Sequence, residues 1–400
     1  MYADYFSLPM MVAAYMFFQY LAVPLVNLCL GKGDFSEALV LGVLGIFAFI
    51  LGSRLPNLLG SRVAPHAGDQ PFLTSKDVRV LYYSSLVFIA IGVLIKIKSC
   101  FFFGGLGCND FFYRVTRPNL LYLSSAIALS AAILLSLRLK MELRKLITLF
   151  LLVFLFTIFV AYSGVGRTLV MGFYCSLFLG VLLVFPQFRK IRYVFMGILL
   201  LILCWILISY IKEMYWIGSG EGRGFNAYFL YTKIINRISQ AHIVENIIKH
   251  WPADIKLYAF GWQDFFTLPA ISIERNYLNG NDFGHAVKII ADDDFVTGIA
   301  PTFIGDLYMR GGAFYGVFLG MFFVGILCRQ FDFLLYSLPR VVALFIYMNM
   351  VPIILHGTED FVFLTLSTNI LMLAFFLTIL MCVYLLIEKK SISNSSINAF

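Results

Sequence analysis

Long apolar runs, nearly free of charge, constrain this chain more than any other feature. A membrane hydrocarbon core about 30 Å thick is crossed by roughly 20 residues, because an α-helix rises about 1.5 Å per residue. Backbone polar groups find no water in lipid, so each run has to be helical. The composition excludes a soluble fold, since 61% of the 400 residues are hydrophobic, 13% are charged and the mean hydropathy is +0.88.

The runs predict an all-α polytopic membrane protein with about ten transmembrane helices. The predicted spans are 8–30, 36–53, 78–97, 119–137, 145–162, 167–185, 193–211, 312–334, 341–356 and 361–387. Residues 1–211 are expected to form a seven-span membrane bundle, and residues 302–400 a three-span C-terminal bundle. Residues 212–301 are expected to form one large outer loop between spans seven and eight.

Charge gives the predicted orientation. The 30 Lys and Arg exceed the 22 Asp and Glu, but they are spread over short connections, which is typical of membrane topology and not of a nucleic-acid surface. Basic residues gather in alternate connections, which places both termini in the cytoplasm by the positive-inside rule. One connection, residues 96–117, runs against the rule because it carries four basic residues on the outer side: Lys96, Lys98, Arg114 and Arg117.

The outer loop contains a predicted amphipathic helix over 228–250, where apolar residues recur every three or four positions. Such a helix is expected to lie in the membrane interface or to cap the bundle. Arg237 lies on its polar side. His242 and Glu245, at i and i+3, form either an acid–base pair or part of a solvated face, and the second reading is the more common one.

Two further segments carry candidate residues. Arg167 ends the segment 163–167, and it either snorkels to lipid headgroups or binds a phosphate with its guanidinium fork. In the segment 297–312, Asp306 and Arg310 are spaced to pair on one helix face, and the glycines permit tight packing. A carboxylate at the edge of lipid also needs a partner or a water-lined cavity.

The block Thr297–Gly320 reads TGIAPTFIGDLYMRGGAFYGVFLG. Together with Gly166–Arg167 and an Arg-Ile-Ser-Gln helix at 237–240, it resembles bacterial O-antigen and oligosaccharide repeat-unit polymerases of the Wzy type. The resemblance implies a hexosyltransferase without cofactor or metal, at the periplasmic face of the bacterial inner membrane. It also implies three kinds of partner: undecaprenyl-diphosphate-linked oligosaccharides, membrane lipids and a chain-length regulator protein.

The resemblance also implies roles for individual residues. Candidate proton acceptors are Asp306, Glu245 and His242, and candidate diphosphate ligands are Arg167, Arg237, Arg275 and Arg114. Other candidate substrate contacts are Tyr308, Arg310 and His356. Asp306 stands where the family often has Glu. Two alternative functions are an O-antigen ligase-like transferase and a transporter of polysaccharide or lipid-linked sugar.

Overall fold

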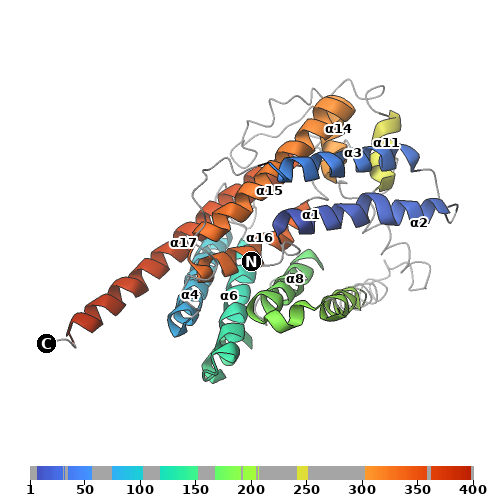
Figure 1. Cartoon of the computed structure of the whole chain (residues 1–400). Helices are drawn as coiled ribbons and strands as arrows, with labels where there is room; N and C mark the ends of the chain where they lie inside the picture. Colours follow the sequence, from blue (N-terminus) through green and yellow to red (C-terminus); the bar gives the residue numbers. More distant parts are fainter. Residues whose placement is uncertain are drawn as a thin grey trace. The chain divides into compact units, whose positions relative to one another are not determined.

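The computed structural model describes residues 7–29, 31, 35–55, 74–101, 118–151, 167–190, 192–203, 206, 241–250, 302–357 and 362–397. All regular structure within these ranges is helical (Figure 1). The labelled helices are α1 (Leu8–Phe17), η2 (Phe18–Ala22), α2 (Val23–Cys29), α3 (Ser36–Ser53), α4 (Ser75–Phe101), α6 (Pro118–Arg138), α8 (Arg167–Val184), η3 (Pro186–Arg189), α11 (Ala241–His250), α14 (Thr302–Gly311), η4 (Gly312–Phe318), α15 (Leu319–Ser337), α16 (Arg340–Gly357) and α17 (Val362–Ile397).

Several helices are long and apolar enough to cross a membrane, which confirms the predicted class of helical membrane protein. In the described ranges there are six such stretches: Leu8–Cys29, Ser36–Ser53, Ser75–Ile95, Leu121–Arg138, Gly312–Leu335 and Met372–Lys389. Three shorter apolar helices are Phe173–Val184, Arg192–Leu203 and Arg340–Pro352. The count of ten spans stays a prediction, because much of 145–162, 193–211 and the outer loop lies outside the described residues.

Two compact units share the chain. Unit 1 comprises Met1–Ala67, Asn226–Ser337 and Ile353–Asn369, and unit 2 comprises Gly68–Phe225, Leu338–Pro352 and Ile370–Phe400. The predicted division of the chain at 211 and 301 follows sequence order, whereas each of these units draws on segments that are distant in sequence. Each unit is therefore assembled through contacts between remote parts of the chain.

Unit 1 is built on close contact between α3 and α15. A Cβ atom added at Gly52 would overlap the backbone carbonyl oxygen of Phe322, and one added at Gly325 would overlap the carbonyl oxygen of Phe49. Lipid tails are as apolar as Leu, so helices in a bilayer associate through van der Waals packing and not through hydrophobic burial. These two glycines therefore set how closely the two backbones can approach.

A helical hairpin opens the span that contains α15. Gly312 has a φ of +67°, in the left-handed region that favours glycine, and it separates α14 from the π-helix η4. Leu307 of α14 packs back on Gly316 of η4 and on Gly320 of α15. The sequence predicts a segment that runs directly into span eight, and the structure instead folds α14 back against the beginning of that span.

In unit 2, α6 packs on α4 through small residues. The hydroxyls of Ser85 and Ser125 are 2.7 Å apart, and Ser125 also donates to the Ser85 carbonyl oxygen at 3.0 Å. A Cβ at Gly92 of α4 would meet the ring of Tyr122 at 2.8 Å. Interhelical hydroxyl pairs and small residues are typical of helix contacts inside membranes.

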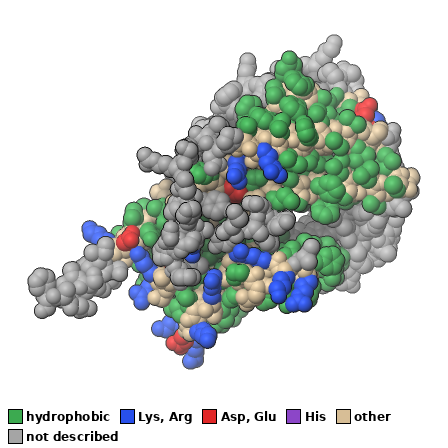
Figure 2. Space-filling view, viewed as in Figure 1, with side chains coloured by type: hydrophobic (Ala, Val, Ile, Leu, Met, Phe, Trp, Pro, Cys, Tyr) green, Lys and Arg blue, Asp and Glu red, His purple; other side chains and the backbone are tan. Residues whose placement is uncertain are grey.

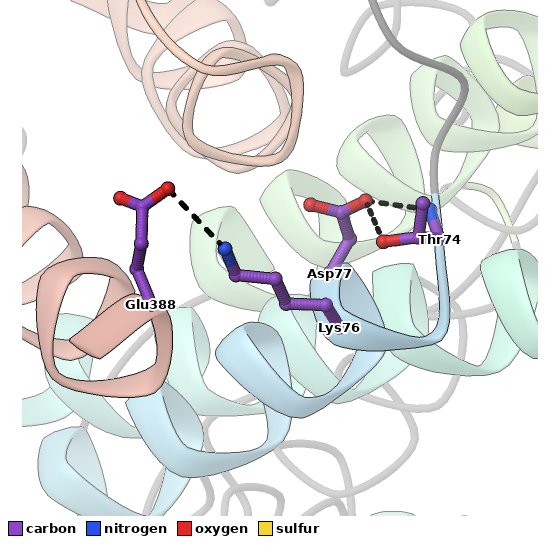
Figure 3. Close-up of polar contacts among 4 residues, drawn as sticks. All are labelled: Thr74, Lys76, Asp77 and Glu388. Carbon is purple, nitrogen blue, oxygen red and sulfur yellow. Dashed lines mark hydrogen bonds and ion pairs between the residues drawn. The ribbon is translucent and has the colours of Figure 1, made fainter. Parts of the chain in front are cut away.

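Aromatic rings and one ion pair add α16 and α17 to unit 2. The ring of Phe88 on α4 stacks on Phe345 of α16, with 5.3 Å between centroids, and meets Phe376 of α17 edge to face at the same distance. Figure 3 shows Lys76 of α4 directed at Glu388 of α17, with 3.5 Å between Nζ and Oε1. Aromatic contacts therefore join α4 to α16 and α17 within the apolar part of the helices, and the ion pair joins the start of α4 to α17.

The α3–α15 contact generates the first prediction. Changing Gly52 to Leu should lower the free energy of unfolding by about 1–3 kcal/mol, since overpacking at a backbone contact forces the helices apart. Unfolding followed by circular dichroism in detergent measures the change. Val43→Leu on the exposed face of α3, where Val43 is 54% exposed, is the control and should unfold as the wild type does. Equal stability of the Gly52 variant and the control would contradict this packing.

Candidate functional site

The strongest candidate site lies in unit 1, where α11 packs against both α3 and α14. Figure 1 shows α11 beside the end of α3 at which that helix begins, close to α14. Two of the predicted acidic residues belong to these helices, Glu245 on α11 and Asp306 on α14. Both side chains are buried in the structure, with residue exposures of 2% and 0%.

Glu245 closes the N-terminus of α3. The Ala38 N–H donates to Oε2 of Glu245 at 2.8 Å in a buried environment. Ala38 is the third residue of α3, and the first four N–H groups of a helix have no acceptor within that helix. The positive end of the helix dipole also favours a carboxylate here. Glu245 therefore satisfies a buried donor, in contrast with the solvated position that the amphipathic pattern favoured.

The second oxygen of Glu245 faces Lys249 one turn later on α11. Its Oε1 lies 3.3 Å from the Lys249 Nζ, without the geometry of a hydrogen bond. The Lys249 side chain is 48% exposed, so solvent screens this ion pair and its contribution to stability is small. The hydrogen bond from Ala38 is consequently the main interaction of the Glu245 carboxylate.

Asp306 lies on a helix that starts with a strained residue. Thr302 is fully buried and has a φ of +67°, which a β-branched residue rarely adopts. Its Oγ1 accepts from the Gly305 N–H at 3.3 Å and so caps α14. Strained backbone of this kind is concentrated at functional sites. The strain at Thr302 thus marks the helix that carries Asp306.

The other predicted site residues are only partly described. Tyr308 is half-buried on α14. Four positions lie on described helices while their side chains lie outside the described part: His242 on α11, Arg310 on α14, Arg167 at the start of α8 and His356 near the end of α16. Arg114, Arg237 and Arg275 lie outside the described residues altogether. The predicted gathering of arginines around one diphosphate therefore stays a prediction.

One buried carboxylate was not among the predicted site residues. Asp332 of α15 is 4% exposed, and its Oδ1 accepts from the Leu8 N–H, the first of α1, at 3.1 Å. Its Oδ2 has no hydrogen-bond partner among the described residues. An acidic residue inside an apolar run is the sequence signal that would have found it, because such a charge always needs a partner.

A metal site is not formed by the described residues, since no three His, Cys, Asp or Glu side chains gather within those ranges. Glu245 lies on α11 and Asp306 lies on α14. An ionised carboxylate can accept a proton or accept a hydrogen bond from a backbone N–H.

Comparison with known proteins adds no assignment: no family model, no curated protein and no solved structure matches this chain.

The Glu245 contact generates the second prediction. Glu245→Ala should cost about 1–3 kcal/mol of stability, because the buried Ala38 N–H loses its acceptor. Glu245→Gln should cost less, since an amide oxygen can still accept. Lys249→Gln, which removes only the exposed partner, should change stability by less than about 1 kcal/mol. Thermal unfolding in detergent measures all three, and a Lys249 variant as damaged as the Ala variant would contradict the assignment.

Proposed function

We propose that this chain is a membrane-embedded glycosyltransferase that polymerises oligosaccharide repeat units carried on undecaprenyl diphosphate. The observation that carries the proposal is the buried Asp306 on the α14–η4 hairpin, one turn after the strained Thr302 in the same helix. These residues belong to the block Thr297–Gly320, which carries the resemblance to repeat-unit polymerases. Buried acidic groups beside a membrane span are costly and are usually functional.

The proposed reaction is a displacement at an anomeric carbon. A hydroxyl oxygen of one lipid-linked unit forms the new bond to the anomeric carbon of another unit. The bond from that carbon to the diphosphate oxygen breaks, and the electron pair leaves with undecaprenyl diphosphate. The hydroxyl proton passes to a carboxylate that acts as general base. No oxidant, metal or nucleotide is needed for the balance of this step.

Asp306 is the preferred base among the three candidates, because it lies in the block Thr297–Gly320 that carries the resemblance. Glu245 is engaged with the Ala38 N–H at the start of α3, so moving its carboxylate to a substrate would uncap that helix. His242 lies on the same helix, α11, so moving that helix to bring His242 to a substrate would also take Glu245 away from α3. Asp306 is fully enclosed in this structure, so proton transfer requires the α14–η4 hairpin to open. The turn at Gly311 and Gly312 is the proposed hinge.

Arginines are proposed to hold the leaving group. Negative charge accumulates on the diphosphate as the bond breaks, and fixed guanidinium groups stabilise it through bidentate hydrogen bonds. Arg167 and Arg237 are the leading candidates, with Arg275 and Arg114 as further ones. Tyr308, Arg310 and His356 are proposed to contact the saccharide. In this proposal the reaction occurs at the periplasmic face of the bacterial inner membrane, with both termini in the cytoplasm.

A second candidate function is transport of a lipid-linked saccharide. The observations that favour it are Asp332, buried inside a candidate span, and the interruptions of helical geometry at η2 and η4. Transporters commonly place ionisable residues and broken helices in their spans. Asp332 lies near the end of the span Gly312–Leu335. Its Oδ1 accepts from the first N–H of α1, so a structural role already accounts for that oxygen.

Asp306→Asn is the third prediction. It should reduce polymer formation by about 10²-fold or more, because the isosteric amide cannot accept the proton. The assay uses purified protein and lipid-linked repeat units of one structure, and it measures the ladder of products. Glu142→Gln, an exposed isosteric charge removal in unit 2, is the control and should retain the wild-type ladder. A full ladder from the Asp306 variant would contradict its role. Translocation by the wild type without any ladder would favour transport.

Arg167→Ala and Arg237→Ala are the fourth prediction. Each variant should fold normally and lose long-chain polysaccharide in a complementation assay, leaving lipid A capped with single units, because the leaving diphosphate loses a cation. Wild-type chain lengths in both variants would remove these arginines from the proposed site.

A further inference from the structure

Four helices of unit 2 bring their charged ends to one surface, which we call the basic end. Lys76 at the start of α4 pairs with Glu388 of α17 (Figure 3). The Arg138 Nη1 at the end of α6 donates to the Val184 carbonyl oxygen at the end of α8, at 2.8 Å. These contacts tie the start of α4 to α17 and the end of α6 to the end of α8. Ser85 of α4 meets Ser125 of α6, and Gly92 meets Tyr122, so the two helices run antiparallel and the start of α4 lies beside the end of α6.

The basic end has a large excess of positive charge. Its described members include ten cationic side chains: Lys76, Arg79, Arg138, Lys140, Arg144, Lys145, Arg189, Lys190, Arg192 and Lys389. Among the described residues of this end, three carboxylates accompany them: Asp77, Glu142 and Glu388. Figure 2 shows Lys and Arg side chains gathered over the lower part of this face, where Figure 1 shows the end of α6.

Some of these cations have structural partners and others do not. Arg138 and Arg189 donate to carbonyl oxygens that end α8, and the Arg189 Nε lies 2.7 Å from the Leu182 oxygen. By contrast, Lys140, Arg144 and Lys145 are exposed and form no ion pair within the described ranges. Exposed cations that the fold does not use are available to a ligand.

Lys140 follows α6 with a backbone conformation that glycine adopts more readily than any other residue. Its φ is +54°, in the left-handed region. The Met141 N–H donates to the Ser136 carbonyl oxygen at 2.9 Å, which is the hydrogen bond of a Schellman motif at the C-terminus of α6. Glycine fills this position at little cost, whereas an L side chain there costs about 1–2 kcal/mol. The chain therefore places a lysine at a position where the backbone conformation favours glycine.

Apolar and aromatic side chains lie among the cations. Leu137 and Ile147, on either side of the α6 turn, are 49% and 41% exposed. The Arg192 guanidinium lies 4.7 Å from the centre of the Tyr193 ring, and that ring packs edge to face on Phe188 at 5.4 Å. Aromatic and basic residues at the ends of spans are typical of the membrane–water interface. A soluble acidic partner would leave these apolar side chains without cover, so a lipid surface fits the basic end better.

We propose that the basic end of unit 2 binds the headgroups of anionic phospholipids, with Lys140, Arg144 and Lys145 as the principal phosphate ligands. Basic residues next to spans attract anionic lipid at about 1 kcal/mol each near the surface. The apolar side chains beside them contact the acyl chains of the same lipids. This inference is independent of the proposed glycosyltransferase reaction, because none of the residues of the basic end belongs to the proposed reaction site.

The fifth prediction tests this surface in the full-length protein. Purified protein is equilibrated with mixed micelles of phosphatidylglycerol and phosphatidylcholine, and the retained lipids are quantified by mass spectrometry. The wild type should retain phosphatidylglycerol preferentially. The triple variant Lys140→Gln, Arg144→Gln, Lys145→Gln should lower that preference by about 10²-fold. Added salt should weaken the preference of the wild type, because it screens exposed charges.

A matched control removes the same charge elsewhere. Arg54→Gln, Lys249→Gln and Arg329→Gln change three exposed cations of unit 1, outside the basic end, and should lower the preference much less than the first triple variant does. Thermal unfolding in zwitterionic detergent checks that both triple variants fold. The proposal is overturned if the wild type shows no preference, or if the two triple variants lose it equally. Displacement of the lipid by glycerol phosphate at the same phosphate concentration would likewise overturn it, because the ligand would then be a free phosphate.

Discussion

Unit 1 depends on two buried carboxylates that supply acceptors to the starts of other helices. Glu245 accepts from Ala38 at the start of α3, and Asp332 accepts from Leu8 at the start of α1. A buried N–H without an acceptor is costly, and no carbonyl within α1 or α3 can accept from the Leu8 or the Ala38 N–H, because both lie in the first turn of their helix. The partners are 207 and 324 positions apart in sequence, so these bonds form only when the whole unit is assembled.

The two carboxylates stabilise opposite ends of one packed pair. Gly45 of α3 lies beside Ile304 and Val317, and Gly52 lies beside Phe322, so α3 and α15 run in the same direction. Glu245 consequently acts where α3 begins, and Asp332 acts beyond the point where α3 ends. Between them the glycine contacts hold the backbones close, the α14–η4 hairpin lies against α3 through Gly45, and Asp306 of α14 is buried. The proposed chemistry therefore rests on a helix that packs on α3 and is followed by the positive-φ turn at Gly312, the proposed hinge.

The spans were predictable from sequence, whereas the site was predictable only in part. Bilayer thickness sets the length of an apolar run, which is why the prediction of a helix over 36–53 coincides with α3. Hydrophobic periodicity identifies the helix that carries Glu245, but periodicity cannot show what covers its polar side, and the covering element is α3. The hairpin at Gly312 depends on a positive φ and on Leu307 meeting two glycines. The apolar pattern of the sequence continues into the span without a break, so it predicts neither the positive φ nor the contacts of Leu307.

Hydrogen exchange at the Ala38 amide, resolved to single residues by mass spectrometry of the full-length protein, tests the role of Glu245 in unit 1 most directly. The carboxylate of Glu245 is the acceptor of this N–H and the environment is buried, so we predict slow exchange, comparable to amides in the middle of α3. Exchange as fast as that of an open helix start would mean that α11 does not close α3, and it would contradict the assembly of unit 1 around its buried carboxylates.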